Sequence, residues 1–367
     1  MNTNIMASVN PESLTQASQF KEGRFHNTHE SPQPGLLKTL EITKRFFFER
    51  GVNKTPLHTV PVEQVTRAQL DALSNTDVHF IKLGHSSILL KIYGEYWLLD
   101  PVFAQRASPF RFLGPKRFHQ APIALDELPP ISKVLISHNH YDHLDKAAVK
   151  KLAAKTQQFL VPLGVESDLE KWGIAAEKIV RFDWWQELPT PNALVAFTPT
   201  QHFSGRGLSD RNSTLWGSWV IKTEGAAIFF SGDSGYFDGF KQIGNRYGPF
   251  DITFIETGAY DNDWADIHMT PEESVQAHID LKGHVMVPVH NGTFDLAFHS
   301  WYDPLERVNS AAIATNSRLF TPVFGQVISF AALQERVQAN VKWWRKLMPE
   351  LSAEPQAQTQ ATVAPQG

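Results

Sequence analysis

The amino-acid sequence predicts an α/β protein in which strands form two sheets and helices pack outside them. Between residues 78 and 330, short apolar runs alternate with turn signals and amphipathic segments. The chain of 367 residues is 42% hydrophobic and includes 25 Phe and 10 Trp, which is enough for a large core. No tandem repeat or linker divides this region, so we expect a single domain over residues 36–345.

The expected strands are ten apolar runs. They lie at residues 78–84, 87–94, 96–101, 133–138, 158–164, 193–202, 215–225, 227–233, 252–258 and 285–290. Amphipathic segments at 145–156 and 270–283 predict helices between these strands. The second helix is expected to begin at Thr270, because Glu273 follows at the spacing of a capping box.

The two ends of the chain differ from this core. Residues 1–35 are polar and irregular, and residues 346–367 are rich in Ala, Gln and Pro, so we expect a flexible N-terminal segment and a disordered C-terminal tail. Residues 35–51 mix apolar and basic side chains at helical spacing. They predict a helix that packs on the domain, with a helix lying on a membrane surface as the alternative.

Composition limits the functions to consider. A net charge of −4 gives no general attraction to polyanions, so we expect no nucleic-acid partner. The chain contains no Cys, so a metal site would have to use His, Asp and Glu. The first residues lack the basic segment and apolar core of a secretory signal, which predicts a cytoplasmic location, with peripheral contact at the inner membrane face as a further option.

The segment "LISHNHYDHLD" (135–145) concentrates candidate metal ligands. His138 and His140 are two residues apart after a strand-like run, so their imidazoles would point the same way in an extended segment. Asp142 and His143 follow where the chain turns towards a helix, and Asp145, at the helix start, is expected to have a local structural role. Such a cluster favours zinc or a similar ion, although clustered histidines also occur as hydrogen-bonded loop residues.

The same pattern recurs at other strand ends. His202, Asp233 and His290 each follow an apolar run that stops where the polar residue begins. Alone, each would more often be a turn or cap residue than a ligand. Together with the 138–143 cluster they supply five histidines and two aspartates, enough for two metals that share one carboxylate. Asp100 ends another run, and we expect its carboxylate to fix the tautomer and orientation of a metal-ligating imidazole.

These residues resemble the ligand set of the metallo-β-lactamase superfamily, whose fold is a four-layer αββα sandwich. Further motifs resemble the branch of that superfamily that contains the N-acyl-phosphatidylethanolamine-hydrolysing phospholipases D and their bacterial relatives. The similarity covers about residues 78–310 and rests on "LGHSSILL", "DPVFAQRASPFRFLGPKRF", "ELPPISKVLISHNHYDHLD", "FTPTQH", "LWGSWVI", "GDSGYFDGFKQIGNRYGPFD" and "HNGTFDLAFH".

The resemblance implies two Zn²⁺ ions per chain and assigns their ligands. One ion would be held by His138, His140 and His202, the other by Asp142, His143 and His290, and Asp233 would bridge them. Asp142, Asp233 and His268 are the expected catalytic residues. His268 would contact the substrate phosphate or protonate the leaving group; a surface or capping role is the alternative. For His85 we expect a structural hydrogen bond in a tight turn.

The implied reaction is phosphodiester hydrolysis of the phospholipase D type. Two zinc ions would lower the pKa of a bridging water and supply a hydroxide without a side-chain base. The expected substrate is N-acyl-phosphatidylethanolamine, a related phospholipid or a small phosphodiester. The alternatives are another hydrolase of this fold, such as a lactonase or a sugar-phosphate lactone hydrolase, and a non-enzymatic metal-binding regulatory protein. The sequence leaves open whether the chain forms a homodimer.

Overall fold

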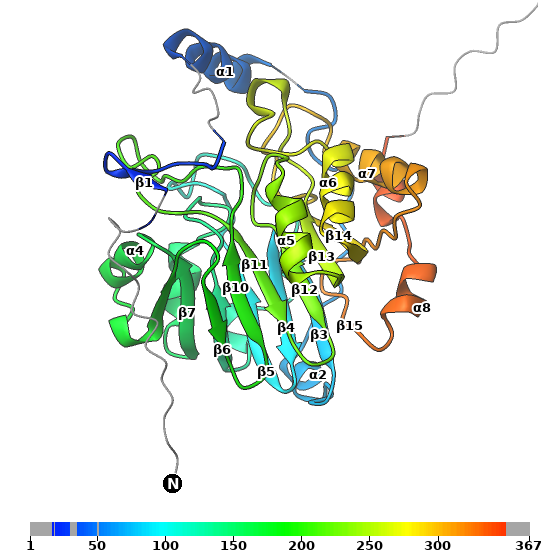
Figure 1. Cartoon of the computed structure of the whole chain (residues 1–367). Helices are drawn as coiled ribbons and strands as arrows, with labels where there is room; N and C mark the ends of the chain where they lie inside the picture. The colour runs from blue at the N-terminus through cyan, green and yellow to red at the C-terminus, as the bar shows by residue number, and fades with distance from the viewer. Residues whose placement is uncertain (1–16, 18, 30–34, 50, 350–367) are drawn as a thin grey trace, which may run out of the picture.

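The computed structural model describes residues 17, 19–29, 35–49 and 51–349, and two mixed β-sheets face each other at its centre (Figure 1). The first sheet has the strand order β15-β3-β4-β5-β6-β7-β8, and the second has the order β14-β13-β12-β11-β10-β9. In the first, β3, β4 and β5 pair antiparallel and β5 to β8 pair parallel; in the second, β9 to β12 pair antiparallel and β12 to β14 pair parallel.

All ten apolar runs form strands, as predicted. The first sheet contains β3 (Val78–Gly84), β4 (Ser87–Ile92), β5 (Glu95–Leu99), β6 (Ile131–Leu135), β7 (Thr156–Pro162), β8 (Ile179–Phe182) and β15 (Ile328–Ser329). The second contains β9 (Glu187–Pro189), β10 (Leu194–Thr198), β11 (Ser218–Lys222), β12 (Ala227–Phe230), β13 (Phe250–Glu256) and β14 (Gly283–Val289). The strands of these two sheets that were not predicted, β8, β9 and β15, are only two to four residues long, which is short for a recognisable strand pattern.

Aromatic side chains fill the space between the sheets. Phe80 and Trp97 of the first sheet pack in one cluster with Phe197, Trp219 and Phe230 of the second, and all five are fully buried. Side chains on the opposite faces of the same strands pack against helices, which is why these strands are apolar on both sides. The large aromatic content of the sequence is therefore used mainly to join the two sheets.

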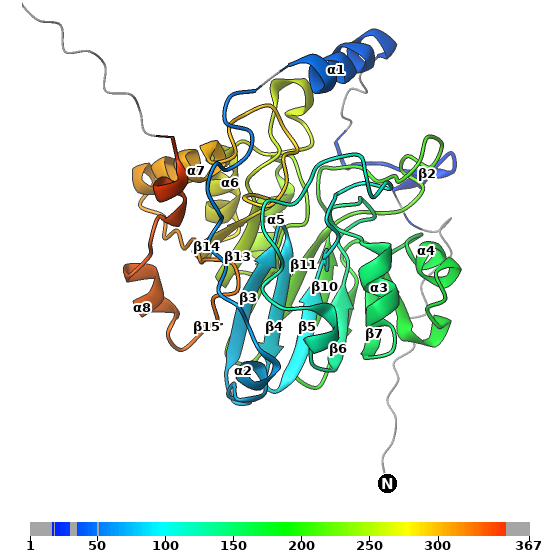
Figure 2. The ribbon, with the colours of Figure 1, turned by 180° about the vertical axis from the view of Figure 1, so that it is seen from behind.

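Helices cover both outer faces of this sandwich. On the first sheet lie α2 (Arg67–Asp71), α3 (Lys146–Leu152) and α4 (Glu166–Lys171), as Figure 2 shows from behind; on the second lie α5 (Gly239–Tyr247), α6 (Pro271–Asp280) and α7 (Asp303–Ala314). Over the described ranges, the remaining helices are α1 (Leu36–Phe48), α8 (Leu333–Gln338), η2 (Leu125–Glu127), η3 (Ala176–Lys178), η4 (Asn262–Trp264) and η5 (Trp343–Leu347). The predicted four-layer αββα sandwich is confirmed, and so is the capping box of Thr270 and Glu273 at the start of α6.

Part of the N-terminal segment that we expected to be flexible packs on the domain instead. Residues 20–25 contain the paired strands β1 (Phe20–Lys21) and β2 (Arg24–Phe25), and the Phe25 side chain is fully buried in the core between the sheets. Asn27 then exchanges hydrogen bonds with the backbone of His202, at 2.8 and 3.1 Å. The rest of the predicted flexible segment, at 1–16, 18 and 30–34, lies outside the described residues. The predicted disordered tail from residue 346 is wrong at its start, because Lys346 and Leu347 belong to η5, and Leu347 and Met348 pack against Trp343 and Trp344. Residues 350–367 of that tail lie outside the described residues.

Residues 35–51 contain the predicted helix, and α1 contacts the domain through charged side chains. Arg45 donates to Asp261 at 2.8 Å and also binds Asp263, and the Lys38 ammonium lies 2.6 Å from Asp263. Among the described residues, no helix combines the length and the apolar character that crossing a bilayer requires.

Candidate metal centre

The candidate ligands lie in loops that follow strands at one end of the sandwich. His138 to His143 follow β6, His202 follows β10, Asp233 follows β12 and His290 follows β14. In α/β sheets, ligands commonly bind beyond the carboxyl ends of the strands. Gly232 lets the chain turn before Asp233: its φ is +56°, and a Cβ there would come within 2.8 Å of the Gly217 carbonyl oxygen.

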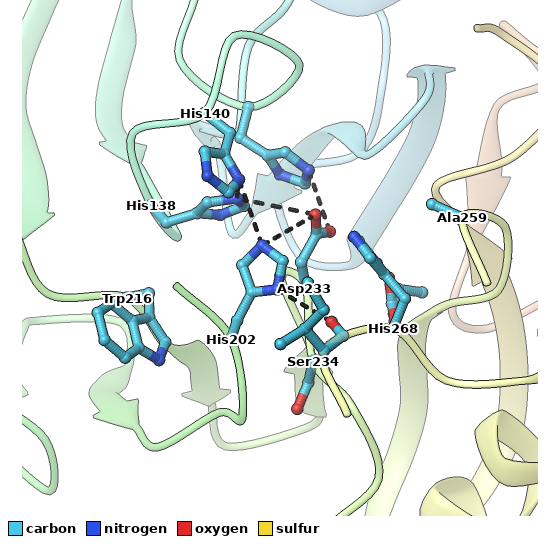
Figure 3. Close-up of polar contacts among 12 residues, drawn as sticks. His138, His140, His202, Trp216, Asp233, Ser234, Ala259 and His268 are labelled. Carbon is cyan, nitrogen blue, oxygen red and sulfur yellow. Dashed lines mark hydrogen bonds and ion pairs between the residues drawn. The ribbon is translucent and has the colours of Figure 1, made fainter. Parts of the chain in front are cut away.

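A first group of donor atoms comes from four predicted ligands. The Nδ1 atom of His140 lies 2.8 Å from Nε2 of His138 and 3.2 Å from Nε2 of His202, and Asp233 completes the group. One donor atom of each residue lies within 4.8 Å of those of the other three, a spacing that one metal ion can span. Figure 3 shows the three imidazoles turned towards the Asp233 carboxylate.

A second group lies beside the first. It contains the three predicted ligands Asp142, His143 and His290, and also His85 from the turn between β3 and β4. The Oδ2 atom of Asp142 lies 3.2 Å from Nε2 of His290 and 3.6 Å from Nε2 of His143. The sequence predicts a hydrogen bond in a tight turn for His85, and its backbone N–H does donate to Thr293, but its side chain also belongs to this group.

Asp233 lies between the two groups. Its Oδ2 is 3.7 Å from Nε2 of both His138 and His202, while its two oxygens lie 3.0 and 3.1 Å from Nε2 of His143 and His290 respectively. The structure thus brings all seven predicted ligands together, with Asp233 in the place that a bridging carboxylate requires.

Two buried atoms test whether these residues fit a metal. Within the described part of the chain, Nε2 of His143 and Oδ1 of Asp233 have no hydrogen-bond partner, although they lie 3.0 Å apart. Buried polar atoms are rarely left without partners, and a cation between these two would satisfy both. The residues present fit a divalent metal.

The electrostatics of the site also favour a cation. Burial disfavours charge on Asp142 and Asp233, but the neighbouring histidines hold the pKa of both carboxyl groups well below the usual range. Burial lowers the pKa of His290, but Asp233 and Asp142 raise it by more than burial lowers it, so that the pKa is about 10. The carboxylates therefore attract positive charge into a largely buried site, and either protons or metal ions can supply that charge.

Two further aspartates form hydrogen bonds close to the candidate ligands. Asp100, predicted for this role, is fully buried and accepts a hydrogen bond from Nδ1 of His143 at 2.6 Å and from the Ser137 backbone N–H at 2.7 Å. Burial raises the pKa of Asp100 despite these bonds. Asp145 caps α3 by accepting from the backbone of Ala147 and Ala148, which confirms its predicted local role.

Glu256 is a site residue that sequence reasoning missed. It is fully buried at the end of β13, and its two oxygens accept hydrogen bonds from Nδ1 of His268 and from the backbone N–H of Met269, each at 2.8 Å. His268, which was expected near the metals, packs beside the rings of His202 and His290. The signal was available, because "ITFIE" is an apolar run that ends in a carboxylate, like the runs that end in Asp100 and Asp233.

A cavity of about 470 Å³ opens onto both groups. His140, Asp142, Asp233, His268 and His290 lie at its polar end. The rest of the wall comes from α1, from the loop after β10, from residues 259–267 and from Leu296. Its apolar members are Ile42, Phe203, Ala259, Trp264, Ile267 and Leu296, and its charged members are Arg211, Asp263 and Asp266. Such a cavity suits a substrate with one polar reacting group and an apolar remainder.

Comparisons with known proteins identify a family and relatives of this chain. The β-lactamase superfamily domain matches residues 96–291. The chain is 46% identical over 247 residues to an uncharacterized protein of Mycobacterium tuberculosis, covering 66% of each chain. It is 34% identical over 285 residues to N-acyl-phosphatidylethanolamine-hydrolyzing phospholipase D 1 of Caenorhabditis elegans, covering 74% of this chain and 80% of the relative.

A solved structure shares the fold. The metallo hydrolase Igni18 of Ignicoccus hospitalis aligns with a TM-score of 0.53 at 21% identity, over 69% of this chain and 98% of that one. The β-lactamase superfamily domain matched at residues 96–291 includes the loops that carry the seven predicted ligands. The chain therefore belongs to the metallo-β-lactamase superfamily of hydrolases.

Proposed function

We propose that this protein is a phosphodiesterase of the phospholipase D type that uses two divalent metal ions, with zinc as the expected metal. Its substrate would be N-acyl-phosphatidylethanolamine or a related phospholipid. The observation that carries the proposal is that two adjacent groups of His and Asp donors, joined by Asp233, lie at the end of a largely apolar cavity. The 34% identity to a nematode enzyme named for this reaction adds support.

The metal ions, Glu256 and His268 would have different roles in hydrolysis. When bound, two divalent ions supply Lewis acidity, which stabilises charge on phosphate oxygens and lowers the pKa of water. Glu256 accepts a hydrogen bond from Nδ1–H of His268, which fixes the orientation of the imidazole and leaves Nε2 for the cavity. When the imidazole is in its protonated form, Nε2 of His268 would donate a proton to the leaving alcohol oxygen, which leaves the ring neutral, or a hydrogen bond to the phosphate. Hydrolysis of the lipid would then yield phosphatidic acid and an N-acylethanolamine.

Contact with a phospholipid surface is part of this proposal. Leu37, Leu40 and Phe48 of α1 have exposed fractions of 83%, 57% and 76%, and the helical period places them on one side with Lys44. Ile42, on the other side, lines the cavity. An apolar and basic face next to the cavity entrance would let a lipid pass from the membrane surface to the site. The cytoplasmic location remains a prediction, and a homodimer remains an option that the sequence leaves open.

The decisive experiment measures hydrolysis by the purified protein. We expect zinc-loaded protein to cleave bis(p-nitrophenyl) phosphate and to release N-acylethanolamine from N-acyl-phosphatidylethanolamine vesicles, and a chelator to abolish both activities. Asp233→Asn should lower the rate by at least about 100-fold, because it replaces the carboxylate between the two groups of donor atoms with a neutral amide. Asp126→Asn removes an exposed aspartate on η2 and should change nothing.

Other results would exclude this proposal. Cleavage of lactones without cleavage of phosphodiesters would favour a lactonase or a sugar-phosphate lactone hydrolase. Stoichiometric metal without turnover of any ester or phosphodiester would favour the regulatory protein instead.

A further inference from the structure

His85 contacts the Asp142 carboxylate in the same way as His290, which is an expected metal ligand. Its Nε2 lies 3.1 Å from Oδ2 of Asp142, and Nε2 of His290 lies 3.2 Å from the same oxygen. The rings of His85 and His290 are neighbours, with centroids 4.0 Å apart. His85 therefore relates to the Asp142 carboxylate as His290 does, from an adjacent direction.

The backbone of His85 is held in an unfavourable conformation. Its φ is +33°, in the region that side chains other than Gly avoid, at a typical cost of about 1–3 kcal/mol. Two hydrogen bonds hold it there: its N–H donates to Oγ1 of Thr293 at 2.7 Å, and its carbonyl accepts from the N–H of His290 at 3.1 Å. A histidine retained in a strained turn and tied to the His290 loop indicates a role for its side chain.

The two donor groups become equal in composition when His85 is included. The first group contains His138, His140, His202 and Asp233, and the second contains His85, Asp142, His143 and His290. Each has three imidazoles and one carboxylate. In the second group the four donor atoms lie within 4.8 Å of one another and His85 is only 1% exposed, so the imidazole has no route to solvent.

We infer that His85 is a third imidazole ligand of the second metal position, an inference that rests on the proposed two-metal centre. With Asp233 included, five side chains reach this position, whereas four reach the first. Four donors suit tetrahedral zinc, while five protein donors and one water suit ions that prefer six ligands, such as Mn²⁺ or Fe²⁺. The two positions should therefore differ in metal preference, and the second should tolerate such ions better than the first.

Two substitutions separate a ligand from a hydrogen-bond donor. His85→Gln keeps an N–H that can donate to Asp142 but removes the imidazole, and His85→Ala removes both. If His85 is a ligand, both variants should fall from two metals per chain to about one when dialysed against limiting free zinc and assayed by mass spectrometry. The matched control is His79→Gln, which alters a buried histidine of β3 and should keep two metals. Two metals in His85→Gln would overturn the inference.

A second measurement needs no variant. A crystal structure of the zinc-loaded protein should place Nε2 of His85 within bonding distance of the second ion, ~2.1 Å. Two bound ions with His85 Nε2 donating to Asp142 instead would overturn the inference. Neither experiment uses turnover, so a protein that binds metal through His85 yet leaves phosphodiesters intact would refute the proposed function alone.

Discussion

A buried lysine supports the loop that carries His290. Lys82 of β3 is 3% exposed, and its ammonium donates to the Pro288 carbonyl at 2.8 Å and to Oδ1 of Asn291 at 3.1 Å. It also lies over the ring of Phe324. No carboxylate is among these contacts, and burial lowers the pKa of Lys82 to about 7. A single amine thus binds residues on both sides of His290, through the backbone carbonyl of Pro288 and the side chain of Asn291.

This lysine should make stability depend on pH. Its pKa is lower in the folded protein than in the unfolded chain, so between about pH 7 and 10 the unfolded chain binds more protons, and the free energy of unfolding rises with pH. From pH 7 to 9 we expect the metal-free wild type to gain about 2 kcal/mol relative to Lys82→Met. Urea unfolding at several pH values measures this difference.

The control for that experiment is Lys150→Met, which removes an exposed lysine of α3. Its difference from the wild type should not change with pH in the same range. A constant difference for Lys82→Met would mean that Lys82 stays charged in the folded protein.

Among the elements, α1 is the one whose exposed face has an unusual composition. Arg45 and Lys38 bind Asp261 and Asp263 on one side, and Leu37, Leu40 and Phe48 lie in solvent on another. The salt bridges orient the helix but bury little of its apolar surface. A helix with this arrangement can keep its position on the domain while it offers apolar side chains to a lipid surface.

We predict that the exposed face of α1 binds phospholipid vesicles. Phe48→Ser should reduce the fraction of protein that sediments with anionic vesicles by at least about half, because a phenyl group contributes roughly 2 kcal/mol of apolar burial. Hydrolysis of soluble bis(p-nitrophenyl) phosphate should not change. Ile313→Ser on α7, where the side chain is 68% exposed, is the matched control. Equal sedimentation of the Phe48 and Ile313 variants would argue against membrane contact by α1.

At the scale of the whole molecule, the candidate centre connects the two sheets. His85 and the 138–143 segment extend from the first sheet, while His202, Asp233 and His290 extend from the second. An ion held by both would link them at one end of the sandwich, in addition to the aromatic core between them. Metal binding should therefore stabilise the fold as a whole.

We predict that metal removal lowers the melting temperature. An ion present at 100 times its dissociation constant adds about 2.7 kcal/mol, so chelation should lower the midpoint by roughly 5 °C or more. Differential scanning calorimetry with and without chelator measures the shift. The shift should be smaller in Asp233→Asn, and an unchanged midpoint in protein that had contained metal would contradict a linking role.

Much of the fold could be predicted from local sequence patterns. The ten apolar runs, the cap at Thr270 and the segments for α1, α3 and α6 depend on neighbouring residues, and each was located correctly. The strand-end rule also identified His202, Asp233 and His290 as candidates, although each residue alone carried weak information. The weak strands β8, β9 and β15 depend on pairing with distant segments, and no local pattern revealed them.

The available chemistry could be read from the residues alone: histidines and aspartates without cysteine, placed after strands, in a chain that resembles a family of metal-dependent hydrolases. Which of these side chains come into contact depends on the fold. His85 and Glu256 contact the site because the turn after β3 and the end of β13 converge on residues far away in sequence. Phe25 is buried because the N-terminal hairpin packs on the core. These contacts form when distant segments of the chain pack together in the fold. The spacing of residues along the sequence does not give the distance between such segments in space.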